Sequence, residues 1–172
     1  MWDQEHRDVL IRQVHQARLP IVLIWLGTCE ITEKSGKYIN LRDYPYQTIE
    51  DTLTEYRELK HSILQANRRA IVIFIECSYY SVIKANKIKG VKSVDKHNSK
   101  DKIVCDLVDY FNEKIRLLNP TNVTIPRLAQ DIIIASKPRT QKEVKYRKNF
   151  NLFHDGVHPL KPLAKLWLHR ML

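Results

Sequence analysis

The sequence lacks the features that mark secreted, membrane-spanning and zinc-binding chains. Its longest apolar run, residues 21–26, is much shorter than the roughly 20 residues that span a bilayer. Charges interrupt the first ten residues, where a signal peptide would have an apolar core. The three cysteines, Cys29, Cys77 and Cys105, form no CxxC or Cys/His spacing, so neither a disulfide scaffold nor structural zinc is indicated. We expect a soluble intracellular protein, cytoplasmic or nuclear, with no membrane span, metal or cofactor.

Composition and charge favour one basic globular domain. The chain has 172 residues and 44% hydrophobic content, which predicts a single domain over residues 1–172. The net charge of +10 gathers in two runs, from Lys84 to Lys102 and from Lys137 to Lys148. Both are poor in apolar residues and are interpreted as solvated loops. A basic surface also permits nucleic-acid contact, although few aromatic residues lie between these charges.

Hydrophobic periodicity predicts alternating helices and strands. Helices are expected at residues 8–17, at 49–69 with Thr48 and Asp51 in capping-box positions, and at 101–119 before Pro120. The continuous apolar runs at 20–27 and 70–77 predict interior strands, and 122–126 is a weaker strand candidate. Residues 33–46 are expected to form a loop. Residues 161–172 predict a closing helix with these residues inward: Leu163, Leu166, Trp167 and Met171.

This alternation indicates an α/β fold, with a mostly parallel sheet between helices in a three-layer α/β/α arrangement. In such sheets ligands bind beyond the carboxyl ends of the strands. That rule directs attention to the segments LGTCEIT and ECSYYS, which follow the two apolar runs, and to HDGVHP near the end of the chain.

The HDGVHP segment places Asp155 and His158 three positions apart, with Gly156 between them, before the closing helix. This spacing allows the carboxylate to orient one imidazole nitrogen while the other faces a nucleophile, as in a hydrolytic triad. A helix cap is the alternative. His154, Asp155 and His158 could also ligate a metal, but no further ligand cluster accompanies them.

The strand followed by LGTCE, the later DGVHP and the terminal amphipathic helix resemble the SGNH (GDSL-like) hydrolase superfamily, in particular domains of invertebrate retroelement-associated proteins. The resemblance implies a flavodoxin-like fold and hydrolysis of esters or acyl esters. It makes His158 the general base and Asp155 its orienting carboxylate. Gly27 corresponds to the glycine of the family's third block. Cys29 stands where the family has an oxyanion-hole asparagine, and a thiol is a weak donor.

The chain departs from the family in its nucleophile. The family's serine lies in a Gly-Asp-Ser block after a first strand, whereas the first serine here is Ser35. We therefore expect a fragment or a degenerate copy that lacks the first strand and is incomplete or inactive as it stands. Ser78 and Ser81 are alternative nucleophiles without a nucleophile elbow. Cys29 paired with His158 is another alternative.

Two kinds of partner follow from these expectations. Without the first strand, residues 21–26 would expose an apolar edge and favour a homodimer. The function from a different class is a non-catalytic scaffold of a mobile-element protein, whose basic segments contact nucleic acid.

Overall fold

The computed structural model describes residues 3–91, 98–136 and 144–171. It is a mixed α/β fold, with 55% helix and 16% strand. The helices are α1 (Gln4–Gln16), α2 (Thr28–Ile31), α3 (Pro45–Ala66), α4 (Val82–Ile88), α5 (Asn98–Leu118) and α6 (Lys161–Met171), with 3-10 turns at Leu128–Ile132 and Phe150–Leu152. The strands are β1 (Ile21–Ile24), β2 (Thr32–Ser35), β3 (Tyr38–Leu41), β4 (Ile71–Phe74), β5 (Ile133–Ser136) and β6 (Lys145–Lys148). None of the helices within these ranges is long and apolar enough to cross a membrane.

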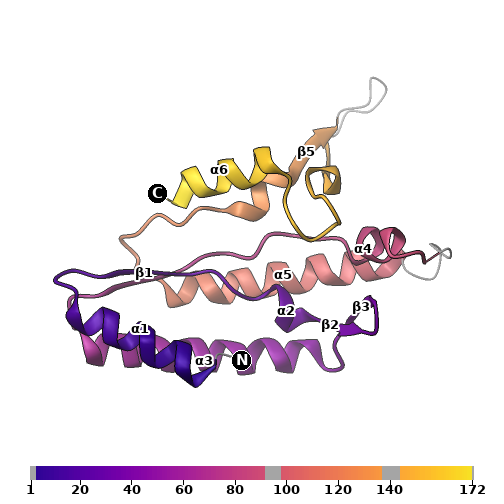
Figure 1. The fold of residues 1–172 in the computed structure, drawn as a ribbon. Coiled ribbons are helices and arrows are strands. Elements are labelled where there is room, and N and C mark those ends of the chain that lie inside the picture. The colour runs from indigo at the N-terminus through magenta and orange to yellow at the C-terminus, as the bar shows by residue number, and fades with distance from the viewer. Residues whose placement is uncertain (1–2, 92–97, 137–143, 172) are drawn as a thin grey trace.

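A parallel pair of strands, β1 and β4, runs through the middle of the molecule, with Val22 opposite Val72. Figure 1 shows α6 on one side of this pair and α3 and α5 on the other. The side chains that face α3 and α5 are the more fully buried ones. Phe74 of β4 is one of them, and Tyr56 of α3 stacks on it at a centroid distance of 4.9 Å. On the other side Trp25 meets Trp167 of α6 edge-on at 5.7 Å.

The expected strands at 20–27 and 70–77 are confirmed as β1 and β4, but β1 is not buried on both faces. Its side chains alternate, with Val22 and Ile24 buried and Ile21 and Leu23 exposed. The predicted mostly parallel sheet is also not what forms within the described ranges. There, β1 and β4 make a two-stranded parallel sheet, while β2 with β3 and β5 with β6 form antiparallel pairs.

The predicted helices are confirmed, with differences at their ends. The helix expected at 8–17 begins earlier, because Asp3 caps α1 by accepting the backbone N–H of Glu5. The capping box at Thr48 and Asp51 is wrong. Tyr44, at φ +56°, precedes Pro45 at the first position of α3, where proline's fixed φ suits a helix start. In α6, Leu163 and Trp167 are buried as expected and Met171 packs against the core, whereas Leu166 is exposed.

The loop expected at 33–46 is largely a β-hairpin. Strands β2 and β3 pair antiparallel, and Gly36 takes φ +59° in the turn between them. Neither strand has a continuous apolar run, so the hydrophobic pattern gave little sign of them. The weak strand expected at 122–126 is absent from that described segment, and β5 begins later, at Ile133.

Much of the two basic runs forms helices and a strand, although residues 89–90 form a turn after α4. Lys84 and Lys87 lie on α4, and Lys100 and Lys102 lie on α5. The second run contributes strand β6. Residues 92–97 and 137–143 of these two runs lie outside the described residues.

Candidate functional site

The turn between the 3-10 helix at Phe150–Leu152 and α6 holds Asp155 and His158 as a hydrogen-bonded pair. His158 Nδ1 lies 2.7 Å from Asp155 Oδ2. The other carboxylate oxygen, Oδ1, accepts the backbone N–H groups of Val157 at 3.0 Å and of His158 at 2.8 Å. Because Nδ1 donates to the carboxylate, Nε2 of the same ring is left to accept a proton. The turn therefore has the arrangement of a general base with its orienting carboxylate.

The surroundings of Asp155 favour its ionised form. Its partial burial raises the pKa of the carboxyl, but the hydrogen bonds from the His158 backbone, the His158 ring and the Val157 backbone, together with the imidazole charge, lower it more. The net result holds the pKa of Asp155 well below its usual range. The carboxylate is thus charged and ready to orient His158 throughout the neutral pH range.

The turn is fixed against α4 through Gly156 and Ser81. Gly156 takes φ +89°, and its carbonyl oxygen accepts the backbone N–H of Ser81 at 2.8 Å. A Cβ at Gly156 would lie 2.6 Å from the carbonyl oxygen of Ser81. Position 156 therefore requires glycine for two separate reasons, backbone conformation and close approach.

Lys84 holds the chain just before this turn. Its Nζ donates to the carbonyl oxygens of Phe150 at 3.0 Å and of Phe153 at 2.7 Å. The sequence assigned Lys84 to a solvated loop, yet the structure uses it as an internal cross-link between α4 and the turn. No local pattern marks this role, because the partners are far apart in the chain.

Beside the turn is a cavity of about 250 Å³ at the carboxyl ends of β1 and β4. His158, Cys29, Thr28 and Ser78 line it. Its remaining wall is mainly apolar and aromatic: Trp25, Tyr79, Tyr80, Phe153, Val157, Pro159 and Trp167. The structure thus brings His158 and Cys29 to one cavity at the carboxyl ends of the parallel strands, while Asp155 contacts His158 without lining it. The sequence did not predict this aromatic wall: Trp167 is buried in the core as expected and also lines the cavity, whereas Trp25 is 43% exposed.

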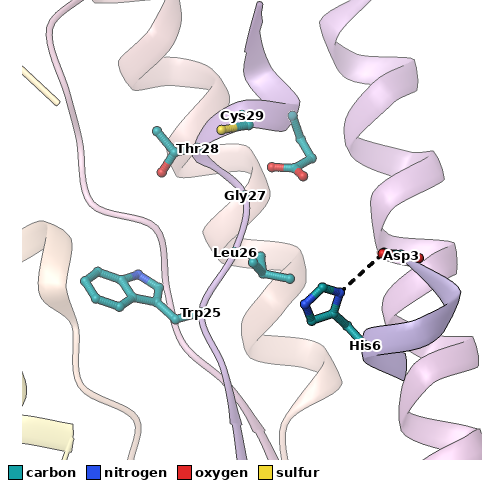
Figure 2. Close-up of a pocket in the computed structure, with 8 residues that line it drawn as sticks. Asp3, His6, Trp25, Leu26, Gly27, Thr28 and Cys29 are labelled. Atoms are coloured by element: carbon teal, nitrogen blue, oxygen red, sulfur yellow. Dashed lines mark ion pairs between the residues drawn. The ribbon is translucent and has the colours of Figure 1, made fainter. Parts of the chain in front are cut away.

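Gly27, the other predicted site residue, lies next to a second pocket. It precedes α2 with φ +128°, and a side chain there would overlap the Phe111 ring and the Cys77 thiol. The second pocket, of about 550 Å³, is lined by Asp3, His6 and residues 25–30. Figure 2 shows Leu26 pointing toward His6, while Trp25 points to the opposite side of the chain.

The alternative serine nucleophiles are placed differently. Ser81 caps α4, since its Oγ accepts the backbone N–H of Lys84 and donates to Asp101 at 2.5 Å. Ser78 lines the cavity, but it is buried and donates to the carbonyl oxygen of Tyr79 at 3.2 Å. The hydroxyls of both serines are therefore engaged within the fold.

The three cysteines differ in accessibility. Burial raises the pKa of the Cys105 thiol to about 11, and that of the fully buried Cys77 further above its usual range. Cys77 donates to the carbonyl oxygen of Leu26 at 3.0 Å. Cys29 is exposed at the cavity. A reagent that needs a thiolate would thus meet Cys29 first.

Metal ligation by this turn has little geometric support. His154 is exposed beside Asp155 and His158, and its backbone N–H donates to the carbonyl oxygen of His158 at 2.8 Å. Across residues 3–91, 98–136 and 144–171, no group of three or more histidine, cysteine or acidic side chains is placed to hold a metal ion.

Comparison with protein-family models, with curated proteins and with solved structures gives no match for this chain. The mixed α/β fold and the geometry of the cavity are thus the observations from which a function can be proposed.

Proposed function

We propose that the chain is an SGNH-hydrolase-like domain, with a flavodoxin-like three-layer arrangement, and that it belongs to the machinery of ester or acyl-ester hydrolysis. The observation that carries this proposal is the His158–Asp155 pair, 2.7 Å apart, at the edge of a cavity that also contains Cys29. The placement of α6 opposite α3 and α5 supports the layered fold (Figure 1).

In the proposed mechanism each residue of the site has one role. His158 takes a proton from the attacking hydroxyl through Nε2 and returns it to the leaving alkoxide. Asp155 holds the ring and stabilises the imidazolium. By the family resemblance, the segment from Gly27 to Cys29 would bind the oxyanion, with the Cys29 thiol in place of an amide; Thr28 and Cys29 line the His158 cavity, whereas Gly27 lines the second pocket. A weaker donor there lowers the rate by about a hundredfold or more.

The nucleophile is the incomplete part of this proposal. The hydroxyls of Ser78 and Ser81 are hydrogen-bonded within the fold. In the family the serine follows a strand that lies beside the third-block strand. The free side of β1 is where such a strand would pair. Because the Ser78 and Ser81 hydroxyls are hydrogen-bonded within the fold, we expect hydrolysis to be slow.

Hydrolysis of p-nitrophenyl acetate tests the proposal. His158→Ala is compared with wild type, and His154→Ala is the matched control because it removes an exposed imidazole from the same turn. Loss of a general base typically costs about a hundredfold or more. We expect His158→Ala to remove whatever rate the wild type shows, and His154→Ala to keep it. Equal rates for wild type and His158→Ala would remove the hydrolase proposal.

A second function, nucleic-acid contact, is favoured by strand β6. It carries Lys145 and Arg147 on one face and, on the other, Tyr146, which is 72% exposed, and Lys148, whose Nζ lies 4.2 Å from the centre of the Tyr79 ring. Basic groups that alternate with an accessible aromatic ring suit a single-stranded nucleic acid. The first basic run supports this function less, because Lys84 is bound to backbone carbonyls and Lys102 pairs with Asp106 at 2.8 Å.

A further inference from the structure

Strand β1 has one paired edge and one open edge. Ile71 donates to the carbonyl oxygen of Pro20 at 2.9 Å, and Ile75 donates to that of Ile24 at 2.8 Å. In a parallel pair, alternate residues direct their backbone groups to the same neighbour, so Val22 and Ile24 face β4. The N–H and C=O groups of Ile21 and Leu23 then face away from β4. Within the described ranges, β1 pairs with β4 and with no other strand.

The other strand of this pair has its outer edge closed by side chains. Asn119 accepts from the backbone N–H of Phe74 at 2.7 Å and donates to the carbonyl oxygen of the same residue at 2.9 Å. Asn112 makes the same double contact with Cys77, at 2.8 Å each. Asn112 lies on α5 and Asn119 directly follows it, and both side chains are buried. Side-chain amides thus hydrogen-bond the backbone groups on the outer edge of β4, whereas the backbone groups on the outer edge of β1 have no such partners in the described structure.

The open edge carries apolar side chains. Ile21 is 62% exposed, and Leu23 and Trp25 are each 43% exposed. No charged residue occurs between Leu19 and Gly27, in a chain of net charge +10. Unpaired backbone groups beside exposed, uncharged, apolar side chains are the features of an edge that accepts another strand.

The carboxyl end of this edge leads to the 550 Å³ pocket, which holds two acidic residues and His6, whose Nδ1 lies 3.5 Å from Asp3 Oδ2. Asp3 and Glu30 line it, and one carboxylate oxygen of Glu30, Oε2, is buried without a hydrogen-bond partner in the described structure. An unpaired buried acceptor is costly, so a docked donor toward which the Glu30 carboxylate turns would relieve that cost. A lysine or arginine at the end of a docked segment would supply that donor.

We propose that the open edge of β1 binds one extended segment of another polypeptide, apolar at alternate positions and carrying a basic residue where it reaches the pocket of Asp3 and Glu30. The segment adds a strand to the β1–β4 sheet, and its backbone pairs with Ile21 and Leu23. The site is the same side of β1 on which the proposed hydrolase fold would pair its first strand, and peptide binding there is measured separately from ester hydrolysis.

A second copy of the chain fits this edge less well than a single strand. Helix α1 packs against α3, with Asn67 Nδ2 donating to the carbonyl oxygens of Val14 at 3.1 Å and of Ala17 at 2.7 Å. Its first turn lies on the open side of the chain, because Asp3 and His6 share a pocket with Leu26 (Figure 2). A second copy would have to fit its own helices beside α1, whereas a lone strand needs room only along Ile21 and Leu23.

The test is selection of peptides from a random 12-residue display library on the intact 172-residue protein. We expect enriched peptides to alternate apolar residues and to carry a lysine or arginine near one end. Their affinity should fall at least tenfold on Leu23→Lys and stay unchanged on Leu168→Lys, the matched control at an exposed leucine of α6. Circular dichroism of both variants checks that each one folds.

Two further measurements make the result decisive. Hydrogen exchange should show the amides of Ile21 and Leu23 slowed at least tenfold when a selected peptide binds, and N-methylation of alternate peptide amides should abolish binding. Failure to enrich any peptide, or enrichment of peptides insensitive to Leu23→Lys, would overturn the proposal. Self-association in sedimentation that Leu23→Lys removes would overturn it in favour of a second copy.

Discussion

Lys84 and Phe153 lie 69 positions apart in the chain, and the Lys84 ammonium donates to the Phe153 carbonyl oxygen at 2.7 Å. The same ammonium reaches Phe150, so one side chain on α4 fixes the segment that enters the Asp155–His158 turn. The position of His158 at the cavity therefore depends on α4 as well as on its own turn.

Replacing Lys84 by methionine should destabilise the protein while keeping the length of the side chain. A hydrogen bond to a charged donor contributes about 1.5–3 kcal/mol, and Lys84 makes two in a partly buried place. We expect a loss of about 2 kcal/mol in the free energy of unfolding, measured by urea denaturation. Lys87→Met, at an exposed position of the same helix, is the control and should change it by less than about 0.5 kcal/mol. Equal effects would mean that the Lys84 contacts contribute nothing specific.

Gly156→Ala should disrupt the turn more than Gly36→Ala disrupts the hairpin. Both glycines have positive φ, +89° and +59°, but only at Gly156 would the new Cβ meet backbone, at 2.6 Å from Ser81. The conformational term costs about 1 kcal/mol at either site, and the steric overlap adds to it at Gly156. Thermal denaturation of the two variants measures the difference, and a smaller loss for Gly156→Ala would contradict the close approach.

Acid should selectively remove the contribution of Asp155 to stability. Its pKa is lower in the folded protein than in the unfolded chain, so the unfolded state binds more protons as the pH falls. The stabilisation is complete above the unfolded value of about 4 and is lost progressively below it. The stability difference between wild type and Asp155→Asn should therefore be largest near pH 7 and shrink below pH 4 in urea titrations. The exposed Asp43→Asn variant controls for general acid effects, and a difference that grows on acidification would contradict the prediction.

If β6 contacts nucleic acid, retention on single-stranded DNA should depend on its charges and on salt. Each phosphate contact contributes about 0.7 to the slope of log affinity against log salt for single strands. Lys145→Ala with Arg147→Ala should therefore lower the slope by about 1.4. Lys102→Ala is the control, since Lys102 pairs with Asp106. Retention by wild type that neither salt nor the β6 substitutions change would exclude this function.

The parts of the fold that sequence predicts best are those with local signals. The apolar runs of β1 and β4 and the apolar stripe of α5 can be recognised without tertiary information. Asp155 meets His158 because the two residues are only three positions apart. The rule that parallel strands end at the same edge accounts for Cys29, after β1, and Ser78, after β4, at one cavity; it does not account for His158, which follows neither strand.

What could not be predicted depends on contacts between distant segments. The hairpin at 32–41 has no apolar alternation of its own, and its strand β3 is held by Asn86, whose side-chain amide pairs with both backbone groups of Ile39. The role of Lys84 likewise requires α4 to lie beside the final turn. Thr48 and Asp51 have the right spacing for a cap, but Pro45 starts the helix before them.

Because the three thiols are unequally buried, a fluorescent label can be attached selectively at the cavity. Cys77 and Cys105 are buried, whereas Cys29 is exposed among the cavity-lining residues. An environment-sensitive dye coupled through a maleimide would enter at Cys29 without any engineered substitution. Its emission would then report when a molecule enters the space beside His158.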